Sequence, residues 1–535
     1  MLPSVERDGR HGLWWPALVA LPDVYGRVVG VTVLGVGGHA VTVEASVGRG
    51  LPSLTVTGLP GAAVQDARDR IRPAMEQAGL EWPLRRVVVN LAPGNLRKEG
   101  AGLDLPIAVS VLVATAQVPA RSVPGFTFFG ELSLKGEVLP TPGVISVAIA
   151  AARRGSSGVV VPAANAVEAA QVAGLRVVGV GTLQDVVGFL RGSWTAPDVQ
   201  PVEPEQRPDA AADLAEVRGQ EQARRALEVA AAGEHNLLMV GSPGAGKTML
   251  ARRLPTILPD MTHDEALEAT QLHSVAGLLA GRGVLRQRPF RAPHHSVSTA
   301  GLLGGGSTVL RPGEASLAHR GVLFLDELTE FRRDAIEALR QPLEDGRIVV
   351  TRTSGSVEFP ARFTLVAAAN PCPCGFAGDI RKACRCREDQ EARYRQKLSG
   401  PLLDRIDLRL TVPRLTKDEL LGASGAEPSA VVRDRVVAAR ERQRHRYRRL
   451  GITCNAHLPG PLARRETRLS AGAEELLARA VDTMALTGRG FDRIVKVART
   501  VADLEAMGDV AAGHVAEALS FRTAFEQDDG LARAG

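Results

Sequence analysis

Cysteine is scarce in this chain of 535 residues, and the five that occur are unevenly spread. Four of them fall between positions 372 and 386, which is not the pattern of a secreted disulfide framework. Long apolar runs are also missing, since no stretch approaches the ~20 residues that cross a bilayer. No small-residue cleavage site follows the short apolar patch near the N-terminus. We therefore expect a cytoplasmic protein without a membrane span.

Lysine is scarce as well: only seven of the 65 basic residues are Lys. Such an arginine bias can reflect the nucleotide composition of a genome as much as function. The net charge of +6 permits a polyanionic partner but does not require one, since basic charge is often only solvated surface. A hydrophobic content of 45% and this length are ordinary for a globular protein of several domains.

Changes in composition divide the chain into blocks. Runs of β-branched residues alternate with helical stretches in the first block, and a second block of the same kind follows a segment rich in proline and charge. The last block is rich in Ala, Arg and Leu and is predicted to be helical. The predicted segments are an N-terminal, disordered extension at 1–24 (with translation from Val24 as an alternative), an α/β front domain at 25–192, a linker at 193–213, an α/β core at 214–413, a helical domain at 414–527 and a tail at 528–535.

The stretch "NLLMVGSPGAGKTML" predicts a nucleotide-binding loop between a strand and a helix, and it fits G-x-x-x-x-G-K-[ST] in full. Backbone N–H groups of such a loop surround phosphate oxygens, and the helix N-terminus adds a favourable dipole. Lys247 would place a cation at the β and γ phosphates, and the Thr248 hydroxyl could ligate Mg²⁺. The residues expected to bind ATP are Gly241, Ser242, Pro243, Gly244, Ala245, Gly246, Lys247 and Thr248.

Two further strands are expected to deliver polar groups to this loop. "RGVLFLDEL" ends in Asp326, which would hold the Mg²⁺, and Glu327, which would polarise the attacking water. "FTLVAAAN" ends in Asn370, which resembles the sensor-1 residue of an AAA+ ATPase; the alternative is an ordinary strand-end turn. Arg405 in "SGPLLDRIDLRL" could be an arginine finger supplied to a neighbouring subunit, or could form an ion pair with a nearby aspartate.

These motifs, together with "RPFRAPHHS", "AAANPCPCG" and "RIVKVARTVADL", resemble the ComM/YifB family of magnesium-chelatase-like AAA+ ATPases. The resemblance implies a multidomain α/β protein, with a Lon-protease-like front domain, a P-loop AAA+ core and a C-terminal helical lid. It also implies a homohexameric ring that uses ATP and Mg²⁺ for branch migration of DNA during recombination of incoming DNA. Arg489 resembles a sensor-2 arginine, with Arg493 as the alternative.

The same resemblance implies a helix-2 insert at about 298–319 and a hairpin at about 345–362, which line the pore of related helicases. Basic residues near these elements would give salt-sensitive, sequence-independent contacts to DNA phosphates, although each could equally belong to a solvated surface. We take His294 and His295 as structural or interface residues, because neighbours on a strand point to opposite faces. The candidate DNA contacts are Arg311, Arg320, Arg347, Arg352 and the stretch 440–450, "RERQRHRYRRL", which includes Tyr447.

The front domain departs from the Lon pattern at the two positions that carry its chemistry. Gly102 stands near the place of the nucleophilic serine, and Ile145 stands near the place of the catalytic lysine. A peptidase needs an activated nucleophile beside a base. We therefore expect an inactive scaffold.

Three interpretations stay open for the clustered cysteines Cys372, Cys374, Cys384 and Cys386. Four cysteines are a common structural Zn²⁺ set, although the C-x-C spacing here is tighter than usual. Reduced thiols without a ligand and redox sensing are the alternatives. A catalytic thiol is disfavoured because no histidine lies nearby in the sequence, and disulfides are disfavoured in a reducing compartment. Cys454 is expected to be an ordinary lone thiol.

Two other functions remain in competition with a motor on DNA. One is the motor subunit of a magnesium chelatase, although the front domain and the four cysteines distinguish this chain from that subunit. The other is a protein-remodelling AAA+ chaperone whose front domain binds proteins. Binding to unfolded proteins but not to DNA would favour the second.

Overall fold

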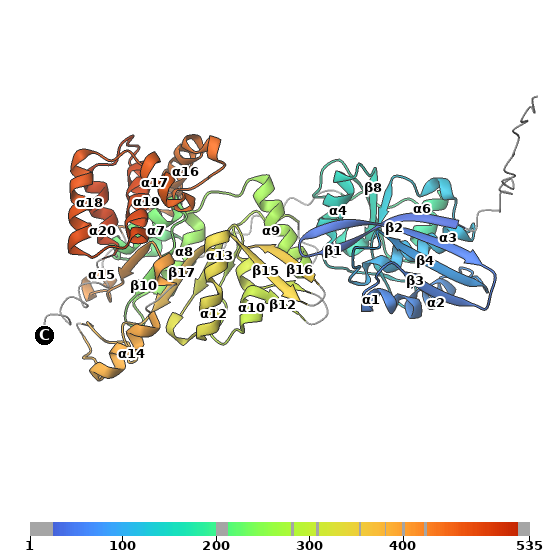
Figure 1. The fold of residues 1–535 in the computed structure, drawn as a ribbon, viewed down its shortest axis with the longest axis horizontal. Helices are drawn as coiled ribbons and strands as arrows, with labels where there is room; N and C mark the ends of the chain where they lie inside the picture. Colours follow the sequence, from blue (N-terminus) through green and yellow to red (C-terminus); the bar gives the residue numbers. More distant parts are fainter. Residues whose placement is uncertain are drawn as a thin grey trace, which may run out of the picture.

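The computed structural model places three units along one long axis, with the front domain at one end and the C-terminal helices at the other (Figure 1). The predicted N-terminal extension, most of the predicted linker and the tail lie outside the described residues. No helix in the described part of the chain is both long and apolar enough to cross a bilayer. The structure describes residues 25–199, 212–279, 283–306, 310–352, 355–379, 381–398, 402–421 and 425–522.

The front domain is built on a mixed seven-stranded sheet in the order β3-β4-β2-β1-β5-β8-β9. A long antiparallel pair forms its middle, with Tyr25 opposite Ser46, while β3–β4, β1–β5, β5–β8 and β8–β9 are parallel. The strands are β1 Tyr25–Leu34, β2 Gly37–Gly48, β3 Ser53–Thr57, β4 Arg86–Ala92, β5 Phe126–Phe128, β8 Gly158–Pro162 and β9 Arg176–Val180.

Helices cover both faces of this sheet. Successive residues of β1 point to opposite sides, so this strand contributes side chains to the packing on both faces. Val28 belongs to the cluster around α3, Asp104–Ala114, whose residues are all buried. Val31 packs instead with residues of α4, Val144–Arg153. Gly26 of β1 lets α3 approach closely, since a side-chain carbon there would lie 2.0 Å from the Ser110 carbonyl oxygen.

The core is a parallel five-stranded sheet in the order β11-β14-β17-β10-β18. Every residue of β10, β14 and β17 is buried, which explains their continuous apolar sequences. The carboxyl ends of parallel strands lie at the same end of the sheet, so the segments that follow these strands lie close together. The strands are β10 Leu237–Val240, β11 Phe290–Arg291, β14 Val322–Leu325, β17 Thr364–Ala369 and β18 Leu408–Thr411.

The C-terminal helices share one apolar cluster with the core. That cluster includes Leu227 of α7, Leu250 of α8, Val436 of α16 and Val497 of α19. The helical domain is therefore attached to the core domain by burial of apolar surface. The helices concerned are α7 Glu221–Gly233, α8 Lys247–Ile257, α16 Ser429–Arg446, α18 Ala471–Thr483, α19 Gly488–Leu504 and α20 Ala512–Ser520. A further helix, α17 Gly460–Glu466, contacts α19 but adds no residue to this cluster.

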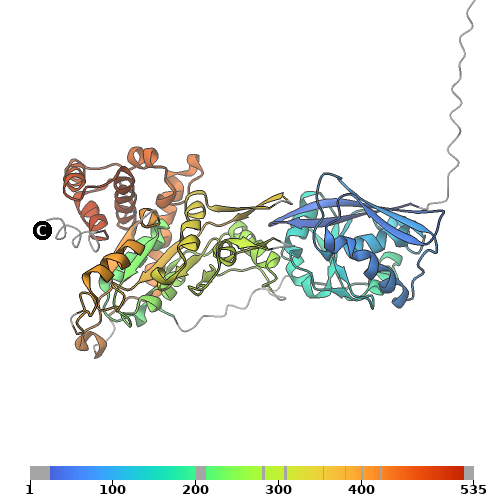
Figure 2. The ribbon, with the colours of Figure 1, turned by 60° about the horizontal axis from the view of Figure 1, so that its bottom comes forward.

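The predicted hairpin is present as β15, Arg347–Arg352, paired with β16, Gly355–Pro360, and it points toward the front domain (Figure 2). The described part of the predicted insert contains α10 Thr299–Leu303, β12 Gly304–Gly305, β13 Arg311–Pro312 and α11 Glu314–Leu317.

Front domain and core meet where α4 lies against α9, His263–Val275. The Gly143 N–H donates to the Ser274 carbonyl at 3.2 Å, and the Ser274 hydroxyl donates to the buried carboxylate of Glu168. Glu168 also accepts from the Ile145 N–H at 3.0 Å. The junction therefore contains a satisfied polar network, and burial raises the pKa of Glu168.

Candidate nucleotide site

The loop after β10 has the geometry of a phosphate-binding loop. Gly244 and Gly246 adopt φ values of +80° and +94°, which glycine accepts without strain. The Lys247 ammonium donates to the carbonyl oxygens of Gly241 at 2.5 Å and Ser242 at 3.2 Å, so it lies inside the loop. Burial lowers the pKa of Lys247, while the charges of Asp326 and Glu327 oppose that shift.

Asp326 follows β14 and reaches the start of α8. The Thr248 hydroxyl donates to Asp326 Oδ2 at 2.7 Å, and the Glu327 N–H donates to Asp326 Oδ1 at 3.0 Å. A hydroxyl and a carboxylate at this separation fit the oxygen ligands that Mg²⁺ takes beside phosphates. Thr248 and Asp326 would hold the ion here.

Glu327 adopts a left-handed conformation with φ +51°, which is unusual for glutamate, and its side chain is about half exposed. Its carboxylate oxygen Oε2 lies 3.5 Å from Nδ1 of His295. His295 in turn packs against His294, with 4.0 Å between the ring centroids and 35° between the ring planes. Sequence reasoning assigned His295 to structure or an interface and missed its position at the candidate base; its place in "RPFRAPHHS", just after a strand, was the available signal.

Asn370 follows β17 and meets the same loop. Its Oδ1 accepts from the Lys247 ammonium at 3.2 Å. Three neighbouring strands, β10, β14 and β17, thus bring four side chains together at their carboxyl ends: Lys247, Asp326, Glu327 and Asn370. This arrangement can hold a triphosphate, a metal ion and an attacking water together.

Arg405 lies at the opposite end of the sheet, at the amino ends of the strands, just before β18. Its carbonyl accepts from the side chain of Asn236, the residue preceding β10, at 2.9 Å, and its guanidinium contacts Glu344. β10 therefore separates Arg405 from the loop that follows this strand. Sequence reasoning proposed a nearby aspartate as the alternative partner, whereas the observed contact is with Glu344.

Arg489 is exposed in the first turn of α19. Arg493, one turn later, lies beside Arg405: its Nε is 3.5 Å from Asp407, and it reaches the Ile406 carbonyl at 3.5 Å. The helix start expected for Arg489 is confirmed. The roles of Arg405, Arg489 and Arg493 toward a nucleotide stay predictions.

The candidate DNA contacts differ in exposure. Arg311 and Arg347 are exposed on the insert and the hairpin, and Arg347 faces Glu358 at 3.3 Å. Arg320 is held by Glu268 at 2.8 Å. The side chain of Arg352 lies outside the described part of the structure.

The expectation of DNA contact by Tyr447 and Arg440 is wrong for these two side chains. Tyr447 is fully buried, and its hydroxyl donates to Asn455 at 2.8 Å. Arg440 is 4% exposed and donates to the Ala231 carbonyl at 2.7 Å. The physical reason is that α16 packs on α7, whose last carbonyls accept hydrogen bonds from a cation.

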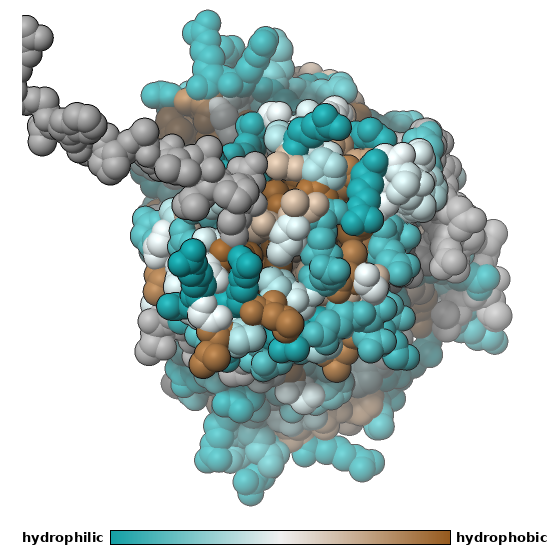
Figure 3. Space-filling view, turned by 90° about the vertical axis from the view of Figure 1, so that its right-hand side faces the viewer, coloured by the Kyte–Doolittle hydropathy of each residue, from teal (hydrophilic) through white to brown (hydrophobic). Residues whose placement is uncertain are grey.

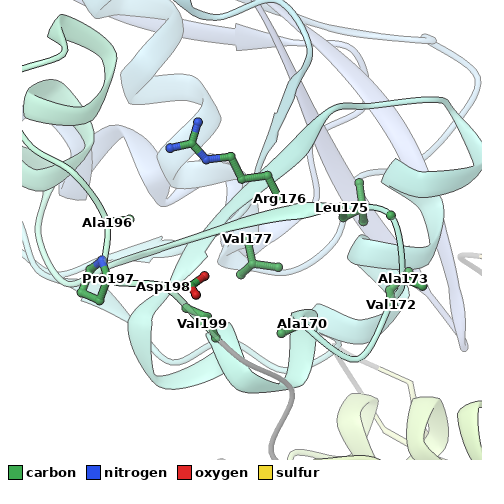
Figure 4. A pocket seen from close by; sticks show the side chains of 11 residues that line it. Ala170, Val172, Ala173, Leu175, Arg176, Val177, Ala196, Pro197, Asp198 and Val199 are labelled. Atoms are coloured by element: carbon green, nitrogen blue, oxygen red, sulfur yellow. The ribbon is translucent and has the colours of Figure 1, made fainter.

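The two positions that matter for peptidase chemistry carry other groups. A side-chain carbon at Gly102 would lie 2.1 Å from the Phe129 ring, so the aromatic ring occupies the space a serine would need. Ile145 is fully buried in α4. A hollow of about 400 Å³ lies between β9 and residues 196–199 (Figure 4), and small apolar residues make up most of its wall. Because it borders the undescribed linker, we assign no site to it.

The structure brings the four clustered cysteines together. Their sulfur atoms all lie within 4.8 Å of one another. Cys454 is buried apart from them, beside Arg440.

Comparisons with known proteins agree with this organisation. Residues 213–420 match a family profile described as "Magnesium chelatase, subunit ChlI", residues 43–165 match "Subunit ChlI of Mg-chelatase", and residues 426–522 match "Magnesium chelatase, subunit ChlI C-terminal". The front domain is also 30% identical over 154 residues to Lon protease 1 of Hydrogenovibrio crunogenus, which is 28% of this chain and 19% of that protein.

Full-length relatives are similar across all three units. "Competence protein ComM" of Haemophilus influenzae is 42% identical over 509 residues, covering 94% of this chain and 98% of the relative. "Uncharacterized protein YifB" of Escherichia coli is 42% identical over 495 residues, covering 91% and 95%. The chain belongs to the ComM/YifB family of magnesium-chelatase-like AAA+ ATPases.

Proposed function

We propose that this protein is a ring-forming, ATP-driven motor that moves DNA, acting as a helicase in branch migration during recombination of incoming DNA. The ATP-driven part of this proposal rests on one observation. Four side chains lie together at the carboxyl ends of the core strands: Lys247, Asp326, Glu327 and Asn370. The DNA half is supported by the name of the Haemophilus relative and by exposed arginines on the insert and the hairpin.

The arrangement of these residues supports ATP hydrolysis. The loop N–H groups and Lys247 bind the β and γ phosphates, and Asn370 fixes the ammonium of Lys247 from the other side. Mg²⁺, when bound by Thr248 and Asp326, neutralises charge on the phosphate oxygens. Glu327 orients the water for in-line attack and accepts its proton. His295 holds the Glu327 carboxylate in position.

The position of Arg405 favours a ring. Arg405 lies at the amino ends of the strands, so it cannot reach its own phosphate-binding loop at the carboxyl ends. It can reach the nucleotide of an adjacent subunit that presents the carboxyl ends of its strands to it. Arg489, with Arg493 as the alternative, would be the sensor-2 arginine that reaches back to the nucleotide. We propose a homohexamer on this basis and on the family resemblance.

The DNA contacts we propose are Arg311 and Arg347, whose side chains are exposed on elements that would face a pore. Binding through phosphates would be independent of sequence and would weaken with salt. The front-domain end of the molecule presents mostly hydrophilic side chains with scattered apolar ones (Figure 3). Leu51 and Leu84, 88% and 75% exposed, belong to this domain, so binding of unfolded protein is a necessary arm of the test.

The test is steady-state ATP hydrolysis at low salt with no DNA, single strands, duplex, a mobile four-way junction or an unfolded protein. We expect junction or single-stranded DNA to raise turnover and Glu327→Gln to abolish it. Arg347→Gln should reduce the stimulation, whereas Arg72→Gln, which removes a comparable surface ion pair with Glu76 in the front domain, should not. Turnover that ignores every DNA but responds to unfolded protein would replace this proposal with the chaperone.

A further inference from the structure

The segment between Asn370 and α14, Glu388–Leu398, carries four thiols in a single cluster. The Cys372 sulfur lies 3.4 Å from that of Cys374 and 3.6 Å from that of Cys384, and the latter two are 3.5 Å apart. Sulfurs that each lie about 2.3 Å from a central ion at tetrahedral angles are about 3.8 Å apart. A disulfide would need about 2.05 Å. The observed spacing suits an ion between the sulfurs and excludes a bond between them.

From this geometry we infer that Cys372, Cys374, Cys384 and Cys386 bind one zinc ion, and that this centre braces the wall of the nucleotide site. The second part rests on the proposed ATPase function, whereas the first does not. Binding requires each thiol to release its proton, so four protons leave as four sulfur–metal bonds form. The product is a dianionic tetrathiolate, which exchanges no electrons with its surroundings.

Backbone and cationic groups around the sulfurs suit thiolates, whereas the Glu391 carboxylate, 2.9 Å from Cys384, must turn away as that thiol loses its proton. Backbone N–H groups of Ala377, Cys374 and Cys386 donate to sulfur atoms at 3.2, 3.3 and 3.4 Å. Such outer contacts orient and stabilise metal-bound thiolates. The loop also carries exposed Lys382 and Arg385, whose positive charges offset the dianion.

The cysteine loop contacts the phosphate-binding loop directly. Gly375 packs on Pro243, since a side-chain carbon at Gly375 would lie 2.7 Å from the proline ring. Asp379, in the same loop, lies 2.9 Å from Arg414. Arg414 donates in turn to the Pro243 carbonyl at 3.0 Å. A rigid cysteine loop would therefore hold Pro243 of the phosphate-binding loop in place.

A second connection leads to the Asp326 side of the site. α14 begins two residues after Cys386, and Tyr394 of this helix accepts from the Thr329 hydroxyl at 2.8 Å. Thr329 belongs to the short helical turn that follows Glu327. One metal ion would thus restrain segments on both sides of the nucleotide.

The chain offers its own control in Cys454. Cys454, Glu234 and His457 also place ligand atoms within 4.8 Å of one another. Arg440 contacts both Cys454 and Glu234, so a cation already occupies that space. Cys454→Ser removes a thiol without touching the four-cysteine loop.

The experiment measures zinc in full-length protein purified without a metal-affinity tag or chelator. We expect about one zinc per chain in the wild type and in Cys454→Ser, and less than about a fifth of that in Cys374→Ser/Cys386→Ser. Zinc removed by a chelator should be replaceable by Co²⁺, with the charge-transfer absorption of a tetrathiolate. Zinc well below one per chain in wild-type protein, together with no Co²⁺ spectrum, would overturn the metal site.

Binding of a fluorescent ATP analogue tests the bracing role without hydrolysis or DNA. Chelator-treated wild type and the double variant should bind it about tenfold more weakly, because misplaced loop groups lose contacts with phosphate. Zinc added back should restore affinity to the wild type but not to the double variant, and circular dichroism checks that the variant is folded. Unchanged affinity after complete zinc loss would overturn the bracing role. Full zinc with no response to DNA would instead contradict the proposed function alone.

Discussion

The imidazole of His295 lies 3.5 Å from the carboxylate of Glu327, although the two residues are 32 positions apart. His295 comes from the segment after β11, and Glu327 comes from the end of β14, the neighbouring parallel strand. The sheet topology therefore places a ring nitrogen against the group proposed to polarise water. A surface contact of this kind adds little to stability, but it limits where the carboxylate can point.

Replacing His295 by alanine should lower kcat about three- to tenfold and leave KM within about twofold, because the positioned base loses orientation but keeps its charge. His294→Ala is the matched control, with a smaller expected effect, since the His294 ring contacts His295 rather than Glu327. Steady-state kinetics check both variants. An unchanged kcat in His295→Ala would show that the contact has no part in turnover.

Asn370→Ala should reduce the rate of single-turnover hydrolysis by about tenfold or more, since Lys247 loses a partner at 3.2 Å and the water loses a possible hydrogen bond. The affinity for ATP should change by less than about threefold, because the loop itself is intact. Single-turnover hydrolysis and nucleotide titration separate the two effects. A large loss of affinity with normal hydrolysis would assign Asn370 to binding instead.

Arg405→Ala and Glu327→Gln should each be inactive alone, yet an equal mixture should recover about a quarter of wild-type turnover. In a mixed ring, an intact site needs Glu327 from one subunit and Arg405 from the next, and random mixing gives this pair at one site in four. Arg405→Ala mixed with the double variant is the control and should stay inactive. If mixed rings form without recovery, Arg405 does not act across the interface.

The front domain should lose stability as pH rises through the pKa of Asp104. Burial raises this pKa from 3.8 to about 6, although the bonded Arg70 opposes the shift. The native state then holds this proton more tightly than the unfolded chain between about pH 4 and pH 6. The contribution is therefore fully present below about pH 4 and lost above about pH 6, with an upper size of about 3 kcal/mol.

Urea unfolding followed by tryptophan fluorescence measures this effect, because Trp82 and Trp194 pack in the front-domain core. Asp104→Asn should show a flatter dependence of unfolding free energy on pH than the wild type. The wild-type side chain loses this contribution between about pH 4 and about pH 6, and the asparagine cannot titrate. Parallel curves for the two proteins would exclude Asp104 as the titrating group.

Local sequence motifs are enough to predict which side chains lie at the nucleotide site, because each motif marks the carboxyl end of a strand and parallel strands bring these ends together. The side chains predicted in this way are Lys247, Asp326, Glu327 and Asn370. The position of His295 depends on which strand neighbours which, and the motif alone does not encode this. Tyr447 lies in a basic stretch typical of a solvated helix, yet it is buried because that stretch closes over Asn455. Phe129 occupies the space beside Gly102 through a contact across 27 positions, which no local pattern indicates.

The hairpin of β15 and β16 rests on the front domain at the turn between β1 and β2. A side-chain carbon at Gly35 would lie 2.7 Å from Val357 Cγ1 and 3.1 Å from the Glu358 carbonyl oxygen. The chain passes from this hairpin into β17, which ends at Ala369, directly before Asn370. One strand therefore connects the proposed sensor residue to a hairpin that contacts the front domain. In the proposed motor, any movement of the hairpin must either push that domain or separate from it.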